Sequence, residues 1–75
     1  RTFKSFLPLL RSSYPDVQLW AVWAIEHVCS QKVERYGQLC FDEGVVDILK
    51  MMLTSNNRWD VKDLAKRALD AIGKH

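Results

Sequence analysis

The chain has 75 residues, of which 48% are hydrophobic and 27% are charged, and its formal net charge is +2 at pH 7. A chain of this length forms one domain at most, and its charged fraction is that of a soluble globular surface rather than of a disordered tail. No apolar run approaches the roughly 18 residues needed to cross a bilayer, and the first four residues lack the apolar core of a secretion signal. We therefore expect an intracellular protein that has no membrane partner. Its expected location is the cytoplasm, with the nucleus as a second option. Because the chain begins with Arg1 and not with Met, we also expect neighbouring segments upstream.

The first predicted helix covers residues 3–11. Apolar residues recur at helical spacing from Phe3 to Leu10, which favours a helix. Pro8 would remove a hydrogen bond if it lay deep inside that helix. We therefore expect the helix to be kinked or to begin near Leu7.

The second predicted helix covers residues 15–30, and its start carries three signals. Ser12 and Ser13 supply capping hydroxyls, and Pro15 suits the first helical position. Asp16 places a negative charge at the positive end of the helix dipole. These signals predict a new helix directly after the first one.

Two further helices follow a polar break at residues 30–32. The first covers residues 33–43 and ends before Gly44, a natural left-handed cap position. Gly37 within it costs about 1 kcal/mol relative to alanine. The next helix covers residues 45–54, because apolar residues again recur at helical spacing there.

The last predicted helix, residues 60–73, is the most clearly amphipathic. Its other positions are mostly charged, and the spacings from Asp63 to Arg67 and from Asp70 to Lys74 allow ion pairs on the helix surface. A polar outer face is what an end-capping repeat requires, so we expect the array to stop here. The core-facing residues of the helix over residues 60–73 are expected to be Val61, Leu64, Ala65, Ala68, Leu69 and Ile72.

An internal repeat accompanies this order of helices. Residues 9–13 align with residues 52–56 at an offset of about 43, within the range of armadillo and HEAT units. Residues 21–25 align with residues 68–72 only with about four more residues of offset, which predicts a longer second loop. No segment alternates apolar and polar residues as a strand does. We therefore predict an all-α, armadillo-like solenoid fragment of about one and a half to two repeats with a C-terminal cap.

The helix over residues 15–30 has two apolar faces. Trp20, Trp23 and His27 share an arc away from the core-facing stripe. The large area of tryptophan favours burial of at least one of them between stacked repeats, and of Trp20 more than Trp23. The expected core-facing stripe consists of Val17, Ala21, Ala24, Ile25 and Val28.

The exposed-groove alternative starts from the pair Trp23 and His27. In armadillo proteins the third helix of a repeat typically presents a Trp and, four positions on, an Asn to a peptide groove, and this pair resembles that arrangement. An imidazole also forms hydrogen bonds with a peptide. Glu26 is either solvated or able to meet a cation such as a free peptide N-terminus. We therefore take Trp20, Trp23, Glu26, His27 and Ser30 as peptide-groove candidates.

Several stretches resemble the C-terminal armadillo-like repeats of the Zyg-eleven family over nearly the whole chain. The clearest is Leu-Trp-Ala-Val-Trp-Ala at residues 19–24, followed by residues 35–36 and 43–44. Members of that family are substrate receptors of cullin-two RING ubiquitin ligases, and their armadillo-like domain captures proteins with an N-terminal glycine. The resemblance implies the same class of role here, with leucine-rich repeats and the contact to the cullin-two complex in other regions. Gly37 and Val45 depart from the family's pattern, which indicates a divergent member.

Catalysis, cofactors and metal ions find no support in the motifs. There is no His-Glu-x-x-His helix, no glycine-rich phosphate loop and no Gly-x-Ser-x-Gly elbow. Cys29 and Cys40 form no Cys-x-x-Cys pair, and we expect reduced core thiols, with a disulfide as the less favoured alternative. We therefore expect a protein that is not an enzyme and binds neither a cofactor nor a metal ion.

Nucleic-acid binding is the main rival to protein binding, because the chain has 11 Lys and Arg residues and three tryptophans. Acidic residues are interleaved with the basic ones, which leaves no basic stripe. We therefore expect a protein or peptide ligand and no nucleic acid. A purely structural capping repeat remains the alternative function.

Overall fold

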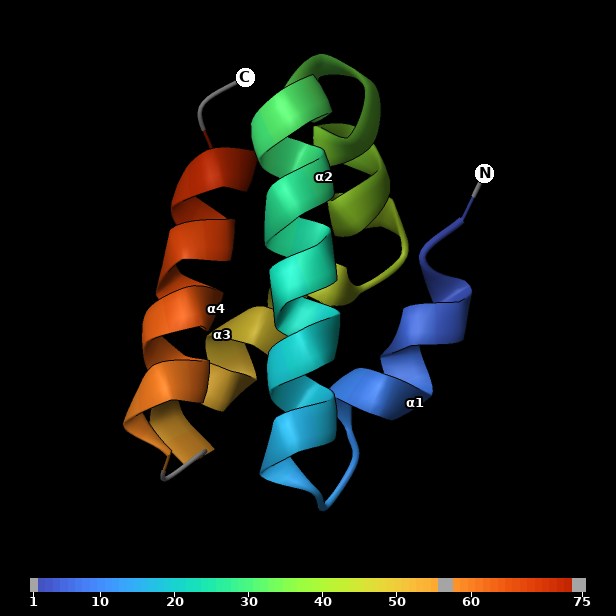
Figure 1. Cartoon of the computed structure of the whole chain (residues 1–75). Helices are drawn as coiled ribbons and strands as arrows, with labels where there is room; N and C mark the ends of the chain where they lie inside the picture. Colours follow the sequence, from blue (N-terminus) through green and yellow to red (C-terminus); the bar gives the residue numbers. More distant parts are fainter. Residues whose placement is uncertain (1, 56–57, 74–75) are drawn as a thin grey trace.

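The computed structural model describes residues 2–55 and 58–73, and in these residues every regular element is a helix. The predicted all-α class is therefore confirmed (Figure 1). The elements are a 3-10 turn and four α-helices: η1 (Lys4–Phe6), α1 (Leu7–Leu10), α2 (Pro15–Asp42), α3 (Val45–Ser55) and α4 (Trp59–Ile72).

The N-terminal segment is divided where Pro8 requires it. The 3-10 turn η1 ends at Phe6, and α1 begins at Leu7 with Pro8 in its first turn. Proline is tolerated there because the first backbone N–H groups of a helix have no intrahelical acceptor. Residues 3–11 are thus two short pieces joined at Leu7, not one helix.

The start of α2 differs from the expectation in its capping. Pro15 occupies the first turn as predicted, but Tyr14 is the N-cap residue and its side chain makes no capping hydrogen bond. Ser12 Oγ instead accepts a hydrogen bond from the backbone N–H of Tyr14, 3.1 Å away. The serine hydroxyl therefore stabilises the turn before the helix and not the helix end.

The polar break at residues 30–32 is a bend inside α2. Lys32 leaves helical geometry, with φ −141° and ψ 52°, so α2 consists of two helical segments on either side of it. The second segment ends at Asp42, and Gly44 then adopts φ +83°. Glycine suits this left-handed position because it has no Cβ to clash with the carbonyl oxygen.

The first segment of α2 and helix α4 pack side by side and run in the same direction (Figure 1). Pro15 and Trp59, their first residues, are 44 positions apart, and their N-cap residues Tyr14 and Arg58 both have extended backbones. This is the arrangement of equivalent helices in successive repeats. The prediction that the second loop is longer than the first is wrong. Helix α3 ends at Ser55 and α4 already begins at Trp59, whereas α1 ends at Leu10 and α2 begins at Pro15.

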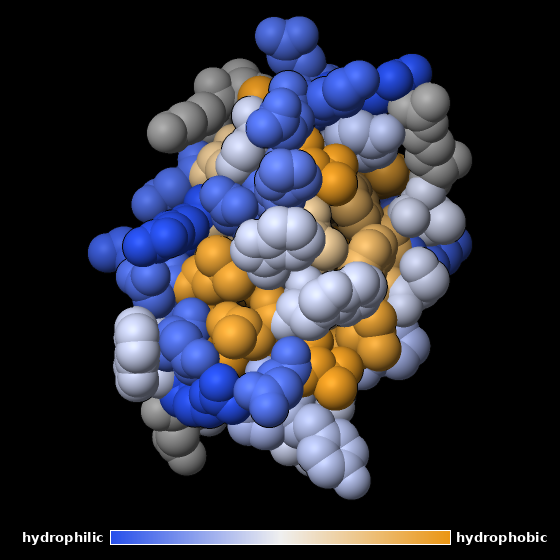
Figure 2. Space-filling view, viewed as in Figure 1, coloured by the Kyte–Doolittle hydropathy of each residue, from blue (hydrophilic) through white to orange (hydrophobic). Residues whose placement is uncertain are grey.

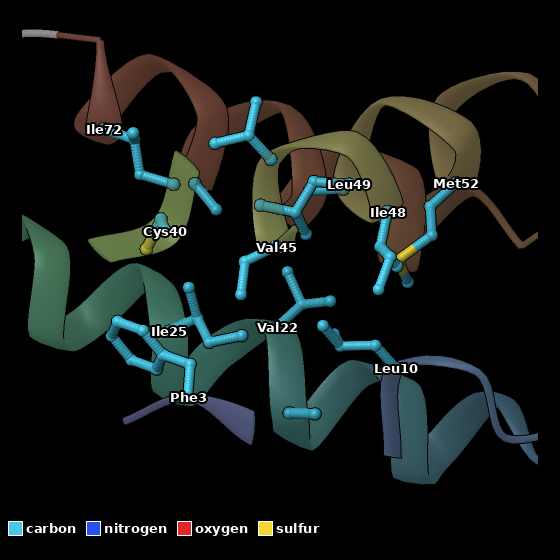
Figure 3. Packing of buried hydrophobic residues seen from close by; sticks show 14 of the residues in the cluster. Phe3, Leu10, Val22, Ile25, Cys40, Val45, Ile48, Leu49, Met52 and Ile72 are labelled. Carbon is cyan, nitrogen blue, oxygen red and sulfur yellow. The ribbon is translucent and has the colours of Figure 1, made fainter. Parts of the chain in front are cut away.

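The core lies between α2 on one side and α3 and α4 on the other, with Phe3 and Leu10 closing it from the N-terminal segment (Figure 3). The fully buried Ala21 and Ala65 occupy equivalent positions of α2 and α4, and such small side chains allow two helices to approach closely. The predicted stripe of α2 is shifted, since Val22 and Cys29 are fully buried and Val17 is only half-buried.

Candidate functional site

An exposed aromatic face lies on the first segment of α2, formed by Trp20, Trp23 and His27. Trp20 is 55% exposed and Trp23 is 51% exposed, so the burial expected for Trp20 does not occur within this chain. The reason is geometric: the side of α2 that carries Ala21 and Ile25 is buried in the core, and the two tryptophans lie on a neighbouring arc of the same helix. A ring stack with Phe6, 6.0 Å between centroids, supports Trp20 from the N-terminal side.

Trp23 and His27 form one flat surface. Their ring centroids are 5.3 Å apart and the ring planes differ by only 12°, as expected for a stacked pair one helical turn apart. Each ring restricts the rotation of the other. The two rings therefore present one paired surface on the aromatic face.

Glu26 and Ser30 lie beside this surface on the same helix. Ser30 Oγ donates a hydrogen bond to Glu26 Oε1, 3.1 Å away. With about 100° between successive helical residues, all five predicted groove residues fall within an arc of about 120°. The structure therefore brings the five candidates together on one side of α2 and leaves the carboxylate of Glu26 oriented by a hydroxyl.

A shallow hollow of about 390 Å³ borders the two indoles; we call it the tryptophan hollow. In Figure 2, orange side chains fill the space between the pale band over α2 and the blue margin over α4. Leu64 of α4 lies 44 positions after Trp20, which places the two side chains next to each other in the parallel pair of helices. The residues that line the tryptophan hollow are Asp16, Leu19, Trp20, Trp23 and Leu64.

Leu19 and Leu64 are the site residues that sequence reasoning missed. Leu64 was assigned to the core because an apolar residue at helical spacing normally faces it. Leu19 flanks the aromatic arc and was not counted among the groove candidates, and both residues are only partly buried. The signal that identifies Leu64 is the 44-residue offset between the two helix starts. At that offset Leu64 is the counterpart of Trp20, whereas the offset used for the second alignment places Arg67 there.

An ion-pair network includes Asp16, one of the lining residues of the tryptophan hollow. Arg58 Nη1 donates to Asp16 Oδ1 at 2.9 Å, and Arg58 Nη2 donates to Asp60 Oδ2 at 2.8 Å. The guanidinium holds the pKa of the Asp60 carboxyl below its usual value, and the two carboxylates raise the pKa of Arg58. Asp16 therefore lines the tryptophan hollow with a carboxyl group that is already paired with Arg58.

The two cysteines lie together in the core and not at this site. Cys29 Sγ and Cys40 Sγ are 3.5 Å apart, both side chains are fully buried, and both are free thiols. The hydrogen bond with Cys29 and the burial of the side chain raise the pKa of the Cys40 thiol. Within residues 2–55 and 58–73, no three His, Cys, Asp or Glu side chains gather closely enough to hold a metal ion.

The described part of the chain contains no helix with the length and apolar character that a membrane crossing requires.

Equivalent parallel helices 44 positions apart, with an aromatic face on one of them, define an armadillo-like helical-repeat unit. The chain belongs to the family of zer-1 homolog-like C-terminal domains, whose model matches residues 1–74. This match confirms the resemblance to the Zyg-eleven family. The membership supports the coarse assignment to protein-binding substrate receptors of ubiquitin ligases. No solved structure matches the chain at a significant level.

Proposed function

We propose that this domain holds a protein ligand against the aromatic face of α2, as part of a cullin-two ubiquitin-ligase substrate receptor that recognises an N-terminal glycine. The observation that carries the proposal is the half-exposed, stacked surface of Trp20, Trp23 and His27 beside the tryptophan hollow. The role is one of binding and not of catalysis. Other regions of an intracellular receptor would make the contact with the ligase complex.

The exposed indoles offer the free energy that such binding needs. Covering the exposed half of one indole removes on the order of 100 Å² from water, which favours binding by about 2–3 kcal/mol. Trp20 and Trp23 lie next to each other, so one ligand segment covers both. Because Phe6 and His27 already restrict the two indoles, little side-chain entropy is lost on binding.

Glu26 supports recognition of a free N-terminus. An α-amino group is mostly protonated near neutral pH, and a carboxylate is its natural acceptor. Glu26 lies almost one helical turn from Trp23, and its side chain is already oriented by the hydroxyl of Ser30. Glycine has no side chain, so a terminal glycine brings its backbone against the indole ring without a steric clash.

The test compares peptides that differ only at their N-terminus. Glycine-initiated peptides and N-acetylated copies are titrated against the full repeat domain and against its Trp23→Ala, His27→Ala and Glu26→Gln variants. We expect the Trp23 variant to lose most affinity for every peptide and the Glu26 variant to lose only the preference for the free amine. Trp59→Ala is the matched control, because Trp59 is 78% exposed and lies outside the hollow. Unchanged binding by a folded Trp23→Ala domain would refute the proposal.

A capping role is the second candidate, and helix α4 supports it. Asp63, Lys66, Arg67 and Asp70 are all exposed on its outer side, and Arg67 Nη2 pairs with Asp63 Oδ2 at 3.2 Å. The predicted pair of Asp70 with Lys74 lies outside the described residues. If this face closes the stack, the double change Lys66→Leu with Asp70→Leu will make the domain self-associate in size-exclusion chromatography. A variant that stays monomeric would argue against the cap.

A further inference from the structure

A second hollow, of about 300 Å³, lies where α2 bends, and it differs in character from the tryptophan hollow. The bend at Lys32 turns the second segment of α2 back, so that side chains from both segments surround one space. We call it the basic hollow. Its lining residues are His27, Val28, Gln31, Lys32, Arg35 and Tyr36.

The basic hollow carries two cations, Lys32 and Arg35, that form no ion pair with the residues that the structure describes. Lys32 and Arg35 are exposed, and among the described residues neither lies within 4.0 Å of a carboxylate oxygen. No Asp or Glu belongs to its described lining. Gln31 adds an amide donor at the same place. A carboxylate is the group that this set of donors fits, because arginine binds it through two parallel hydrogen bonds.

His27 connects the basic hollow to the aromatic face. It lines the hollow and at the same time stacks on Trp23. From Trp23 to Gln31 the helix rises about 12 Å, which an extended peptide covers in about four residues. A peptide that lies along α2 with its end at Trp23 therefore places a later side chain over Lys32 and Arg35.

We infer that the basic hollow binds an acidic side chain of the captured protein, about four residues from the residue that lies against Trp23. This inference rests on the proposed function and adds to it a preference at a second position of the ligand. The partner chemistry is an extended segment with a free glycine at its start and an Asp or Glu shortly after it. The aromatic face supplies most of the affinity, and the basic hollow supplies part of the specificity.

The test scans one glutamate along a glycine-initiated, otherwise neutral peptide, from the second to the eighth position, with affinities measured by fluorescence anisotropy. We expect glutamate at about the fourth or fifth position to tighten binding about two- to fivefold at low salt, and the gain to shrink at about 0.3 M NaCl. Arg35→Gln should remove that gain and leave the affinity for the neutral peptide unchanged. Arg67→Gln is the control, since it removes the same charge on α4 and should keep the gain.

Reversing the charge at position 35 gives a stronger test if the neutral substitution Arg35→Gln has only a small effect on affinity. Arg35→Glu should disfavour the acidic peptide and favour the peptide with lysine at the same position. A glutamate scan without any preferred position, or an Arg35→Gln variant that keeps the gain, would overturn the inference. A random oligonucleotide that binds more tightly than the acidic peptide, and loses its affinity in Arg35→Gln, would overturn it in favour of nucleic acid.

The two proposals fail in different ways. If N-acetylation has no effect but the glutamate gain depends on Arg35, the glycine preference is wrong and the acidic site stands. If the free amine matters but the position of the glutamate does not, the proposed function stands and this inference is wrong.

Discussion

Arg58 joins the starts of the two parallel helices by donating from Nη1 to Oδ1 of Asp16, 2.9 Å away and 42 positions earlier in the chain. The same guanidinium donates to Asp60 from both Nε and Nη2. Asp16 and Asp60 are 44 positions apart, so one arginine holds the equivalent acids of two successive repeats. A single cation therefore bridges the starts of the two helices that carry and border the candidate site.

Arg58→Ala should lower the Tm of the chain by a few degrees at low salt and by less at high salt, because the contacts are exposed and screened. Asp16→Asn should have a smaller effect, since Arg58 keeps its contacts with Asp60. Differential scanning calorimetry of the two single variants and the double variant measures the coupling. Strictly additive effects would show that the pair contributes nothing in solution.

Glu43 gives the chain an acid-sensitive anchor for its N-terminal segment. Its carboxylate accepts hydrogen bonds from the backbone N–H of Phe3 and from the hydroxyl of Thr2, and these bonds lower the pKa of Glu43. A lowered pKa in the folded state means that the stabilisation is complete above about pH 4.5 and is lost as the pH falls through the folded-state pKa.

The Tm of the wild-type chain should therefore exceed that of Glu43→Gln at neutral pH, and the gap should close in acid. Thermal unfolding from about pH 7 to about pH 3 measures it. Glu34→Gln makes the same chemical change at an exposed position of α2, the helix that ends just before Glu43, and should show a smaller Tm difference at neutral pH. A difference in Tm between the wild-type chain and Glu43→Gln that does not change with pH would contradict the anchoring role of Glu43.

Gly44→Ala should destabilise the chain by about 1–2 kcal/mol, because alanine is strained at φ +83°. A Cβ at Gly44 meets no atom within 4 Å, so the cost comes from the backbone and not from a clash. Gly73→Ala is the matched control, since φ is −75° there and a Cβ would lie 3.4 Å from the Leu69 carbonyl oxygen. Urea unfolding should place that control within about 0.5 kcal/mol of wild type.

Both thiols should resist alkylation while the chain is folded. Cys29 and Cys40 are fully buried, and the raised pKa of Cys40 further reduces its reactive thiolate. Mass spectrometry after iodoacetamide treatment should show an unmodified native chain and a doubly modified chain in denaturant. Rapid single modification of the folded chain would mean that the bend at Lys32 opens to solvent.

The sequence predicted the helices and much of the core because those features depend on local spacing. Val61, Ala65, Ala68 and Ile72 are buried, as the periodicity of the last helix predicts. The same periodicity placed Leu64 in the core, but its side chain is only partly covered. Spacing along one helix identifies a stripe, but it does not tell how much of that stripe a neighbour covers.

The sequence predicted which residues form the candidate site, but it did not predict which other parts of the fold surround them. Trp20, Trp23 and His27 share an arc of any helix, so their clustering follows from the sequence alone. The sequence located the break at residues 30–32, where α2 bends at Lys32. The exposure of Trp20, the contribution of α4 and the packing of the two segments of α2 around the basic hollow depend on how separate helices meet. The repeat offset that would have predicted the contribution of α4 was misplaced by a few residues.

The exposure of the two indoles also makes the domain its own optical sensor. Two of its three tryptophans lie where a ligand would exclude water, so their emission should shift to shorter wavelength as the ligand binds. Trp59 lies outside the tryptophan hollow and would contribute a constant background, which Trp59→Phe removes. Unlabelled candidate partners can then be ranked directly by intrinsic fluorescence, with the signal arising from the side chains that are proposed to bind.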